Sequence, residues 1–379
     1  CMSVDKLNRT VLGLVAVSLF LVSGAVLAEY PLNLTEGVTP TSQRVYDLHM
    51  DIFYIVTVIG IAVFGVMTWS IFHHRKSKGA VAAQFHHSTT AEVIWTIIPI
   101  LILVGMAIPA TKTLVFMEKT GDAEMTLKVT GYQWKWKYDY LDEDISFFST
   151  LSEEDNKARQ RNSGIDPHTI DNYLKNVDNP VVLPVDTKIR ILTTAADVIH
   201  SWWVPALGWK RDAVPGYIND NWTYIEEPGI YRGKCTELCG KDHGFMPIVV
   251  HAVSKEEYAA WVDEKKAAAA AMQDESGKEY TLDEQIARGE KIYNTQCAAC
   301  HQAKGQGIEG MFPALDGSPI ATGAAAGHIN IVLKGKNLMP AFKDQMSDAE
   351  LSAVITFERN AWSNAVGDIV QPADVKAAR

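Results

Sequence analysis

The sequence predicts a multidomain membrane protein: a two-helix transmembrane hairpin, then a β-sandwich or Greek-key barrel, then an all-α domain. Three observations carry this prediction. Two apolar runs in the first third of the chain each approach the ~20 residues needed to cross a bilayer. Short segments of alternating polarity follow them, which is typical of strands. The last third contains Cys297-Ala298-Ala299-Cys300-His301, a signature that marks a further domain.

Composition limits the number of domains and the kind of partner. A chain of 379 residues is too long for one compact domain and predicts two or three. Charged residues make up 21% and the formal net charge is −10, which argues against a nucleic-acid partner and suits a basic protein partner. The five cysteines are Cys1, Cys235, Cys239, Cys297 and Cys300. Four of them form two closely spaced pairs, which indicates metal or heme chemistry.

The first apolar run, residues 11–28, follows Lys6 and Arg9 and ends in small residues. Basic residues, an apolar stretch and small residues in this order predict a secretory signal peptide over residues 1–28. The alternative is a retained signal anchor, since the run is nearly long enough to span a bilayer. No function is predicted for Cys1, which precedes Met2.

Residues 29–119 are predicted to form the transmembrane hairpin. The apolar runs 50–72 and 93–115 predict helices over about 46–72 and 93–116. The loop 73–78 between them is rich in Lys, Arg and His, and the positive-inside rule places it in the cytoplasm. Everything after Lys119 then lies on the periplasmic side of a bacterial inner membrane. The alternative is a pair of buried core helices in a soluble protein.

Residues 120–254 are predicted to form the β domain. Aromatic residues alternate with other residues over 132–140, which predicts one strand with an aromatic face. Further strands are predicted at 181–185, 188–193, 222–225, 229–234 and 248–253, with turn formers between several of them. Many short strands favour a sandwich or barrel. The polar segment 151–179 is predicted to be an insertion, a loop with a short helix, and no function is predicted for it.

One loop places four candidate metal ligands within twelve residues: Cys235, Cys239, His243 and Met246. Thiolate, thioether and imidazole ligands together select copper over hard cations, and two thiolates at this spacing can bridge two metal ions. A second imidazole must come from elsewhere, and His200 follows a predicted strand from which it can meet the loop. A disulfide is the alternative in an oxidising compartment. Zinc also binds Cys and His, but it gives no reason for the methionine.

The segment 255–281 is rich in Ala, Glu and Lys and is predicted to be a partly helical, semi-rigid linker. The domain after it, residues 282–365, carries the attachment signature of c-type heme. Cys297 and Cys300 would form the thioethers and His301 would be the proximal iron ligand. The tail over residues 366–379 carries no signal and is predicted to be loose.

The second axial ligand of a c-type heme is usually a methionine, which raises the reduction potential. Met311 follows His301 closely and is interpreted as packing against the wall of the heme pocket. Met346 directly precedes a capping box and suits a hydrophobic staple. Met339 lies in a loop before Pro340 and is the predicted ligand.

From about residue 45 to 253 the sequence resembles subunit II of the heme–copper oxidases. The resemblance runs through the hairpin, Gly131-Tyr132-Gln133-Trp134, the segment around His200 and the cysteine loop. It implies a β domain of the cupredoxin type. It also implies a mixed-valence dinuclear copper centre, called CuA, bound by His200, Cys235, Cys239, His243, Met246 and the backbone carbonyl of Glu237. The Glu237 carboxylate would bind a magnesium ion shared with subunit I.

The resemblance gives roles to two further residues that also have ordinary structural explanations. Trp134 would be the residue at which electrons enter above the copper, although it also suits simple packing on a strand. Glu92 would mark the cytoplasmic mouth of a proton pathway into subunit I. Thr89 and Glu92 also have capping-box spacing, and an acidic residue is favourable at a helix N-terminus. The two interpretations of Glu92 are compatible.

Residues 282–362 resemble a class I cytochrome c, which is an all-α fold. The resemblance implies an N-terminal helix around 286–294 that crosses a C-terminal helix around 348–360. Gly289 and Tyr293 would face Phe357 at the crossing, and the carbonyl of Pro313 would lie near His301.

Together the two resemblances imply subunit II of a bacterial cytochrome c oxidase with a fused cytochrome c. A c-type cytochrome would donate electrons to the heme c. CuA would pass them to the heme a and heme–CuB centre of subunit I, where oxygen is reduced to water with proton pumping. Subunit III and the lipid bilayer are the other expected partners.

Three alternatives are weighed against this function. The small subunit of a CuA-containing nitric oxide reductase can look similar. A nitrous oxide reductase also carries CuA, but it needs a large histidine-rich propeller that the sequence does not contain. A membrane-tethered electron carrier without a fixed oxidase is the third, although the hairpin and Glu92 favour docking into a fixed complex. The intact copper ligands exclude a quinol oxidase subunit.

Overall fold

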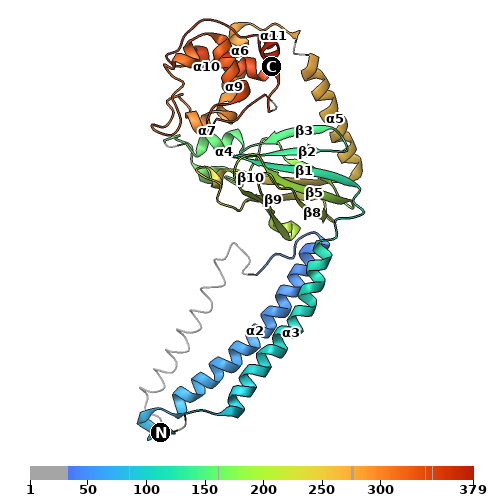
Figure 1. Cartoon of the computed structure of the whole chain (residues 1–379), viewed down its shortest axis with the longest axis vertical. Helices are drawn as coiled ribbons and strands as arrows, with labels where there is room; N and C mark the ends of the chain where they lie inside the picture. The colour runs from blue at the N-terminus through green and yellow to red at the C-terminus, as the bar shows by residue number, and fades with distance from the viewer. Residues whose placement is uncertain (1–32, 85, 161, 275–276, 338, 344) are drawn as a thin grey trace. The chain divides into compact units, whose positions relative to one another are not determined.

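A computed structural model describes residues 33–379 except residues 85, 161, 275–276, 338 and 344 (Figure 1). The predicted signal peptide and Cys1 lie outside the described residues. The chain divides into two compact units, the membrane hairpin and a larger unit that contains the β domain and the C-terminal helices. Each unit is described by itself.

The hairpin consists of α2 (Pro40–His73) and α3 (Thr89–Met117), with the short helix η1 (Lys76–Lys78) between them. Their most apolar 18-residue windows have mean hydropathies of 2.2 and 2.4, and none of the side chains in these windows is buried. At 1.5 Å per residue, 34 and 29 residues are both long enough to cross a hydrocarbon core of about 30 Å. The pattern is that of membrane spans rather than of buried core helices.

The predicted capping box at the start of α3 is wrong. The hydroxyl of Ser88, one residue earlier than expected, accepts the Ala91 N–H at 3.5 Å. The N–H of Glu92 is already in the helical ladder, donating to the Ser88 carbonyl at 3.0 Å. Ser88 therefore caps α3, and Glu92 lies in its first turn with an exposed side chain.

The β domain contains two five-stranded sheets. Their strand orders are β3-β2-β1-β5-β8 and β4-β10-β9-β6-β7. The strands are β1 (Met125–Tyr132), β2 (Lys135–Tyr140), β3 (Ile145–Ser149), β4 (Val181–Pro184), β5 (Lys188–Ala195), β6 (His200–Val204), β7 (Trp209–Ala213), β8 (Asn219–Tyr224), β9 (Gly229–Cys235) and β10 (Pro247–Val253). Both sheets contribute to one hydrophobic core, so the domain is a sandwich, as predicted.

The single strand predicted over 132–140 is wrong, because a turn at Gln133-Trp134 divides it. Tyr132 pairs with Lys135 across this turn, and β1 and β2 run antiparallel. Trp136, Tyr138 and Tyr140 still share one buried face, as the period of two requires. Neither turn residue is a usual two-residue turn former. Trp134 consequently lies at the end of a hairpin and not in the middle of a strand.

The insertion predicted over 151–179 contains a short helix, as expected. It forms α4 (Glu153–Ala158) and the 3₁₀ turn η2 (Pro167–Thr169). The hydroxyl of Ser152 caps α4 by accepting the N–H of Asp155. Leu151 forms an isolated bridge with Val177, which closes the base of the insertion.

The segment predicted as a linker is largely the helix α5 (Lys255–Asp274), and its first turns belong to the β domain. Val262 is buried in the sandwich core, and Tyr258 and Trp261 pack against it. The ring of Trp261 lies 5.0 Å from that of Tyr140. These apolar residues recur at helical spacing, which composition alone did not reveal. Figure 1 shows α5 running beside the strands.

The C-terminal domain is all-α, as predicted. Its helices are α6 (Leu282–Gln296), α7 (Ala298–His301), α8 (Pro319–Thr322), α9 (Ala325–Lys334), α10 (Asp348–Asn360) and α11 (Pro372–Ala378). The implied crossing of α6 and α10 is present: a Cβ on Gly289 would meet the carbonyl oxygen of Ala353 at 2.1 Å, so only glycine fits. The rings of Tyr293 and Phe357 lie 5.4 Å apart beside it.

The tail predicted to be loose is packed. Val370 and Val375 are buried in the core of the C-terminal domain, and Pro372 starts α11. Arg379 pairs with Asp348 at 2.8 Å. Two buried valines in a short segment are too few to produce a recognisable period, so the sequence pattern did not predict this helix.

Candidate metal centre and heme pocket

Strand pairing brings the predicted copper ligands together. His200 is the first residue of β6 and Cys235 the last residue of β9, and Trp202 of β6 pairs with Cys235. The chain then forms a loop that carries Cys239, His243 and Met246 and returns as β10 along β9. The ligands from one loop therefore lie next to a histidine from a neighbouring strand.

The cluster is compact, and all of its members except the half-buried His243 are buried. The sulfur atoms of Cys235 and Cys239 lie 3.8 Å apart. Nδ1 of His200 is 3.9 Å from the Cys235 sulfur, and Nδ1 of His243 is 3.6 Å from the Cys239 sulfur. The Met246 sulfur is also 3.6 Å from that of Cys239. Each thiol thus has one imidazole beside it.

The spacing excludes the disulfide and fits a metal centre. A disulfide needs an S–S distance of about 2.05 Å, and both cysteines are free. Metal–thiolate bonds are about 2.3 Å long, so one ion can touch both sulfurs across 3.8 Å. The Glu237 carbonyl oxygen lies 3.3 Å from the Cys235 sulfur, and the Glu237 side chain is exposed. A thioether beside thiolates favours copper over zinc.

Hydrogen bonding shifts the pKa values of the cysteine pair in opposite directions. The hydrogen bond from Cys239 lowers the pKa of Cys235 to about 3, with a further contribution from His200 and against the effect of burial. The same bond, together with burial, raises the pKa of Cys239 well above its ordinary value. The pair therefore holds one proton between two sulfurs, and binding metal through both thiolates requires its release.

Asp197 is a member of the site that the sequence reasoning missed. Its Oδ1 lies 2.9 Å from Nε2 of His200, which leaves Nδ1 facing Cys235. Burial alone would lower the pKa of His200, but the hydrogen bonds with Asp197 and Cys235 outweigh burial and raise this pKa. Burial alone would raise the pKa of Asp197. The hydrogen bonds from His200 and from the Gln133 and Val198 N–H groups outweigh burial and lower this pKa. A carboxylate three residues before a candidate metal-binding histidine was the available signal.

Trp134 lies against the cysteine loop. Its indole N–H donates to the Cys239 carbonyl at 3.2 Å, and the Gln133 amide donates to the same oxygen at 2.8 Å. Gly240, at a φ of +115°, comes so close that a Cβ there would lie 3.2 Å from the Trp134 ring. The turn at Gln133-Trp134 thus holds the indole of Trp134 against the loop that carries the candidate copper ligands.

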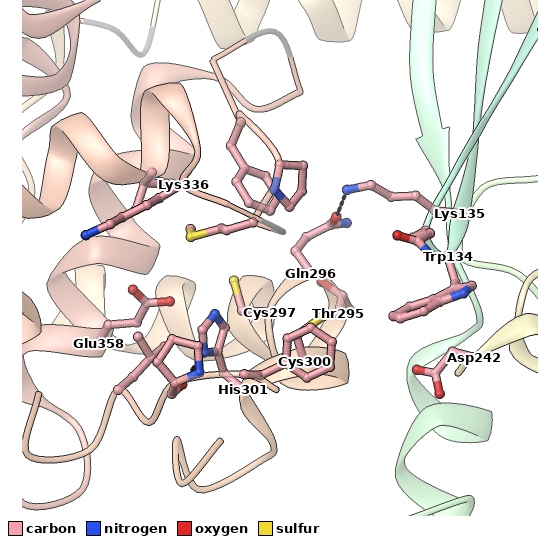
Figure 2. Close-up of a pocket in the computed structure, with 18 of the residues that line it drawn as sticks. Trp134, Lys135, Asp242, Thr295, Gln296, Cys297, Cys300, His301, Lys336 and Glu358 are labelled. Atoms are coloured by element: carbon pink, nitrogen blue, oxygen red, sulfur yellow. Dashed lines mark hydrogen bonds between the residues drawn. The ribbon is translucent and has the colours of Figure 1, made fainter. Parts of the chain in front are cut away.

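The heme-attachment signature lines a cavity of about 510 Å³. Cys297, Cys300, His301 and Met339 are among its lining residues, and both cysteines are free (Figure 2). Nδ1 of His301 is 2.9 Å from the Pro313 carbonyl oxygen, as the resemblance implies, which leaves Nε2 for a metal. Cavities of this size hold cofactors and other small molecules, and the side chains present fit a covalently bound heme.

The three candidate methionines differ in position. Met339 lines the cavity and packs against the core of the domain. Met311 also lines the cavity, but its side chain is 56% exposed. Met346 packs against the domain core next to Ser347, which begins the predicted capping box of α10.

Several charged or titratable residues of this cavity were not predicted, among them His328, Glu358 and Lys135. Buried His328 and Glu358 bind each other, with Nε2 and Oε2 2.8 Å apart. Lys135 reaches the cavity from β2, and burial lowers its pKa to about 8. Lysines in strands and an acid in an amphipathic helix are common surface features, so no sequence signal distinguished these residues.

Three family models match the chain. The one described as the transmembrane domain of cytochrome c oxidase subunit II matches residues 28–113, and the one for the periplasmic domain of the same subunit matches residues 125–253. A model described as cytochrome c oxidase, cbb3-type, subunit III, matches residues 284–357.

Named relatives agree with these matches. A probable cytochrome c oxidase subunit 2 of Rickettsia bellii is 40% identical over 263 residues, which cover 69% of this chain and 93% of the relative. Cytochrome c oxidase subunit 2 of Arabidopsis thaliana is 39% identical over 241 residues, which cover 62% of this chain and 88% of the relative. The solved periplasmic domain of subunit II of cytochrome oxidase of Bradyrhizobium japonicum is 39% identical, covers 39% of this chain and 98% of that chain, and has a TM-score of 0.35.

Proposed function

The chain belongs to the family of cytochrome c oxidase subunit II and is part of a terminal oxidase, and from this premise we propose how electrons cross it. Electrons enter at the C-terminal cytochrome c domain, pass to the copper domain, and leave toward the heme–copper centre of subunit I. The contact of Trp134 with both the heme cavity and the Cys239 carbonyl carries this proposal.

The copper domain binds two copper ions in a CuA centre. When bound, the centre accepts and releases one electron at a time. Its ligands are His200, Cys235, Cys239, His243, Met246 and the Glu237 carbonyl. The supporting observation is the 3.8 Å between two buried sulfurs that each face an imidazole. Asp197 orients His200, and burial keeps water from His200, Met246 and the two cysteine sulfurs.

The C-terminal domain binds heme c, which supplies a second one-electron carrier. Cys297 and Cys300 would form the thioether links to the heme, and His301 and Met339 would bind its iron. The Pro313 carbonyl fixes the His301 ring so that Nε2 faces the cavity. Trp134, which lines the cavity from the copper domain, is the residue at which electrons enter that domain.

The remaining roles follow from family membership and the hairpin. The two soluble domains lie on the periplasmic side of the bacterial inner membrane. Glu92 is the cytoplasmic mouth of a proton pathway, and the Glu237 carboxylate binds a magnesium ion shared with subunit I. Subunit III and a c-type cytochrome donor complete the assembly, which reduces oxygen to water with proton pumping. The relatives favour this function over a nitric oxide reductase or a tethered carrier.

Metal analysis of the full chain in detergent, matured with heme and loaded with copper, tests the ligand assignment. We expect two coppers per iron, and loss of copper with retention of heme in Cys239→Ser. Thr236→Ser, in the same loop, is the matched control and keeps both coppers. One copper per iron, or copper retained without the Cys239 sulfur, would contradict a dinuclear centre.

A further inference from the structure

The insertion, to which the family assignment gives no role, contacts the heme domain. The Asn156 side chain in α4 donates to the backbone carbonyl of Asn294 at 2.9 Å. Asn294 lies in the last turn of α6, three residues before the heme-attachment residue Cys297. Both Asn156 and Cys297 line the same cavity.

The same end of α4 is fixed to the copper loop by Arg159, which follows the helix directly and donates from Nε to Oδ1 of Asn156 at 2.7 Å. Arg159 donates to both carboxylate oxygens of Asp242 at 3.3 and 3.2 Å, and its guanidinium lies 4.4 Å from the centre of the Phe245 ring. Asp242 is 3% exposed and directly precedes the proposed copper ligand His243. Breaking a buried pair of this kind leaves one charge uncompensated, so the contact resists separation.

Lys135 forms a second bridge, next to Trp134. Its ammonium donates to the Gln296 side-chain oxygen at 2.8 Å, as the dashed line in Figure 2 shows. It lies 4.6 Å from the ring of Phe148 in the copper domain and 5.2 Å from that of Phe342 in the heme domain. A buried lysine is costly unless it is hydrogen-bonded or lies over aromatic rings, and Lys135 has both kinds of contact.

The two bridges end on the same short stretch of α6. Asn294 accepts from Asn156, Gln296 accepts from Lys135, and Cys297 follows directly. Trp134 lies beside Lys135 and binds the Cys239 carbonyl. The contacts therefore join the residues nearest the heme attachment to those nearest the copper ligands.

We propose that Lys135, Asn156 and Arg159 form a docking clamp that holds the heme domain against Trp134. The clamp gives the insertion its function, as the docking surface for the chain's own cytochrome domain. It rests on the proposed electron route, because its role is to keep the two carriers at a fixed separation. Without it the heme domain loses both hydrogen bonds from Lys135 and Asn156 to α6, so the docked fraction falls and electron transfer slows.

The test uses the full chain in detergent, with heme and copper in place. The double variant Lys135→Met/Asn156→Ala removes both bridges to α6. The control Lys137→Met/Lys157→Ala makes matched changes on the same strand and helix, where Lys137 pairs with Asp139 and Lys157 with Glu153. The heme is reduced by a pulse, and the transfer of the electron to copper is followed by absorption at several solvent viscosities.

The clamp predicts at least a tenfold slower transfer in the double variant, with a rate that now depends on viscosity because domain docking limits it. The heme and copper spectra and potentials stay unchanged, and the control stays within about twofold of wild type. An unchanged rate in the double variant would overturn the clamp. So would a slower rate accompanied by altered spectra, because damage to the centres would then explain it.

Amide hydrogen exchange measured on the same samples tests docking without electron transfer. The clamp predicts that segment 151–160 and the last turn of α6 lose protection in the double variant and keep it in the control. Equal protection in all three proteins would overturn the clamp. If wild type transfers no electron from heme to copper, the proposed function fails, and the exchange data alone decide the clamp.

Discussion

The buried ammonium of Lys135 makes the stability of the copper domain depend on pH. Burial lowers its pKa from 10.5 to about 8, so between these values the unfolded chain holds a proton that the folded chain lacks. The free energy of unfolding therefore rises with pH across this window, by up to about 1.4 kcal/mol per pH unit. Below pH 8 the folded chain bears the full cost of burying the charged ammonium. Stability increases with pH because the folded state disfavours the charged form of this lysine.

Lys135→Met removes this dependence. The difference in unfolding free energy between wild type and variant should change steadily from pH 8 to 10.5, in favour of wild type at high pH. Denaturant unfolding of both proteins, followed by the absorption of the copper centre, measures it. A difference that is constant over this range would show that the lysine is not buried.

Replacing Met339 tests which methionine binds the heme iron. Met339→Leu should lower the reduction potential of the heme by on the order of 100 mV, because loss of a thioether ligand destabilises the reduced iron. Met311→Leu is the matched control, since Met311 also lines the cavity but is largely exposed. Redox titration followed by the heme absorption measures both potentials. A lower potential in Met311→Leu alone would show that Met311, not Met339, is the ligand.

At the level of elements, the crossing of α6 and α10 depends on one glycine. A methyl group on Gly289 would overlap the backbone of Ala353 and lie 2.6 Å from Cβ of Phe357. Gly289→Ala should destabilise the heme domain by at least about 1–3 kcal/mol, as overpacking does.

The matched control for this substitution is Gly327→Ala in α9. A Cβ at Gly327 meets nothing within 4 Å, so alanine there should be neutral or stabilising by up to about 1 kcal/mol through helix propensity. Thermal unfolding followed by the heme absorption compares the two variants. Equal stability of the two alanine variants would contradict the close crossing.

The elements that sequence predicted well are those with a long period or a fixed motif. The two spans have long, strongly apolar runs, and the cysteine loop carries its candidate ligands in one short stretch. The predicted C-terminal helix coincides with α10, Asp348–Asn360, because a capping box marks its start. Local sequence determines each of these features.

The elements that sequence missed are determined by tertiary contacts. The Gln133-Trp134 turn is held by Asp197 and by the Cys239 carbonyl, which are distant in sequence. The first turns of α5 and the helix α11 pack through a few apolar residues within polar segments. The position of Lys135 in the heme cavity follows from the same folding and has no local signature, whereas Asp197 stands three residues before His200 in the sequence.

For the whole molecule, the order of domains determines how electrons would be delivered along the proposed route. Attaching the cytochrome replaces a collision between two proteins by an intramolecular encounter, with effective concentrations on the order of mM for short linkers. The docking clamp goes further by keeping the two domains together. On the proposed route the surface of the heme domain still meets an external reductant, and the net charge of −10 suits a basic donor.

The most direct test of the electron route is pulsed one-electron reduction of the heme in the wild-type full chain, with heme and copper absorption recorded together. The account predicts that the heme is reoxidised at the rate at which copper is reduced, and that this rate does not depend on protein concentration. A heme that stays reduced beside oxidised copper would contradict the route. A rate that rises in proportion to protein concentration would contradict it too, because electrons would then pass between molecules.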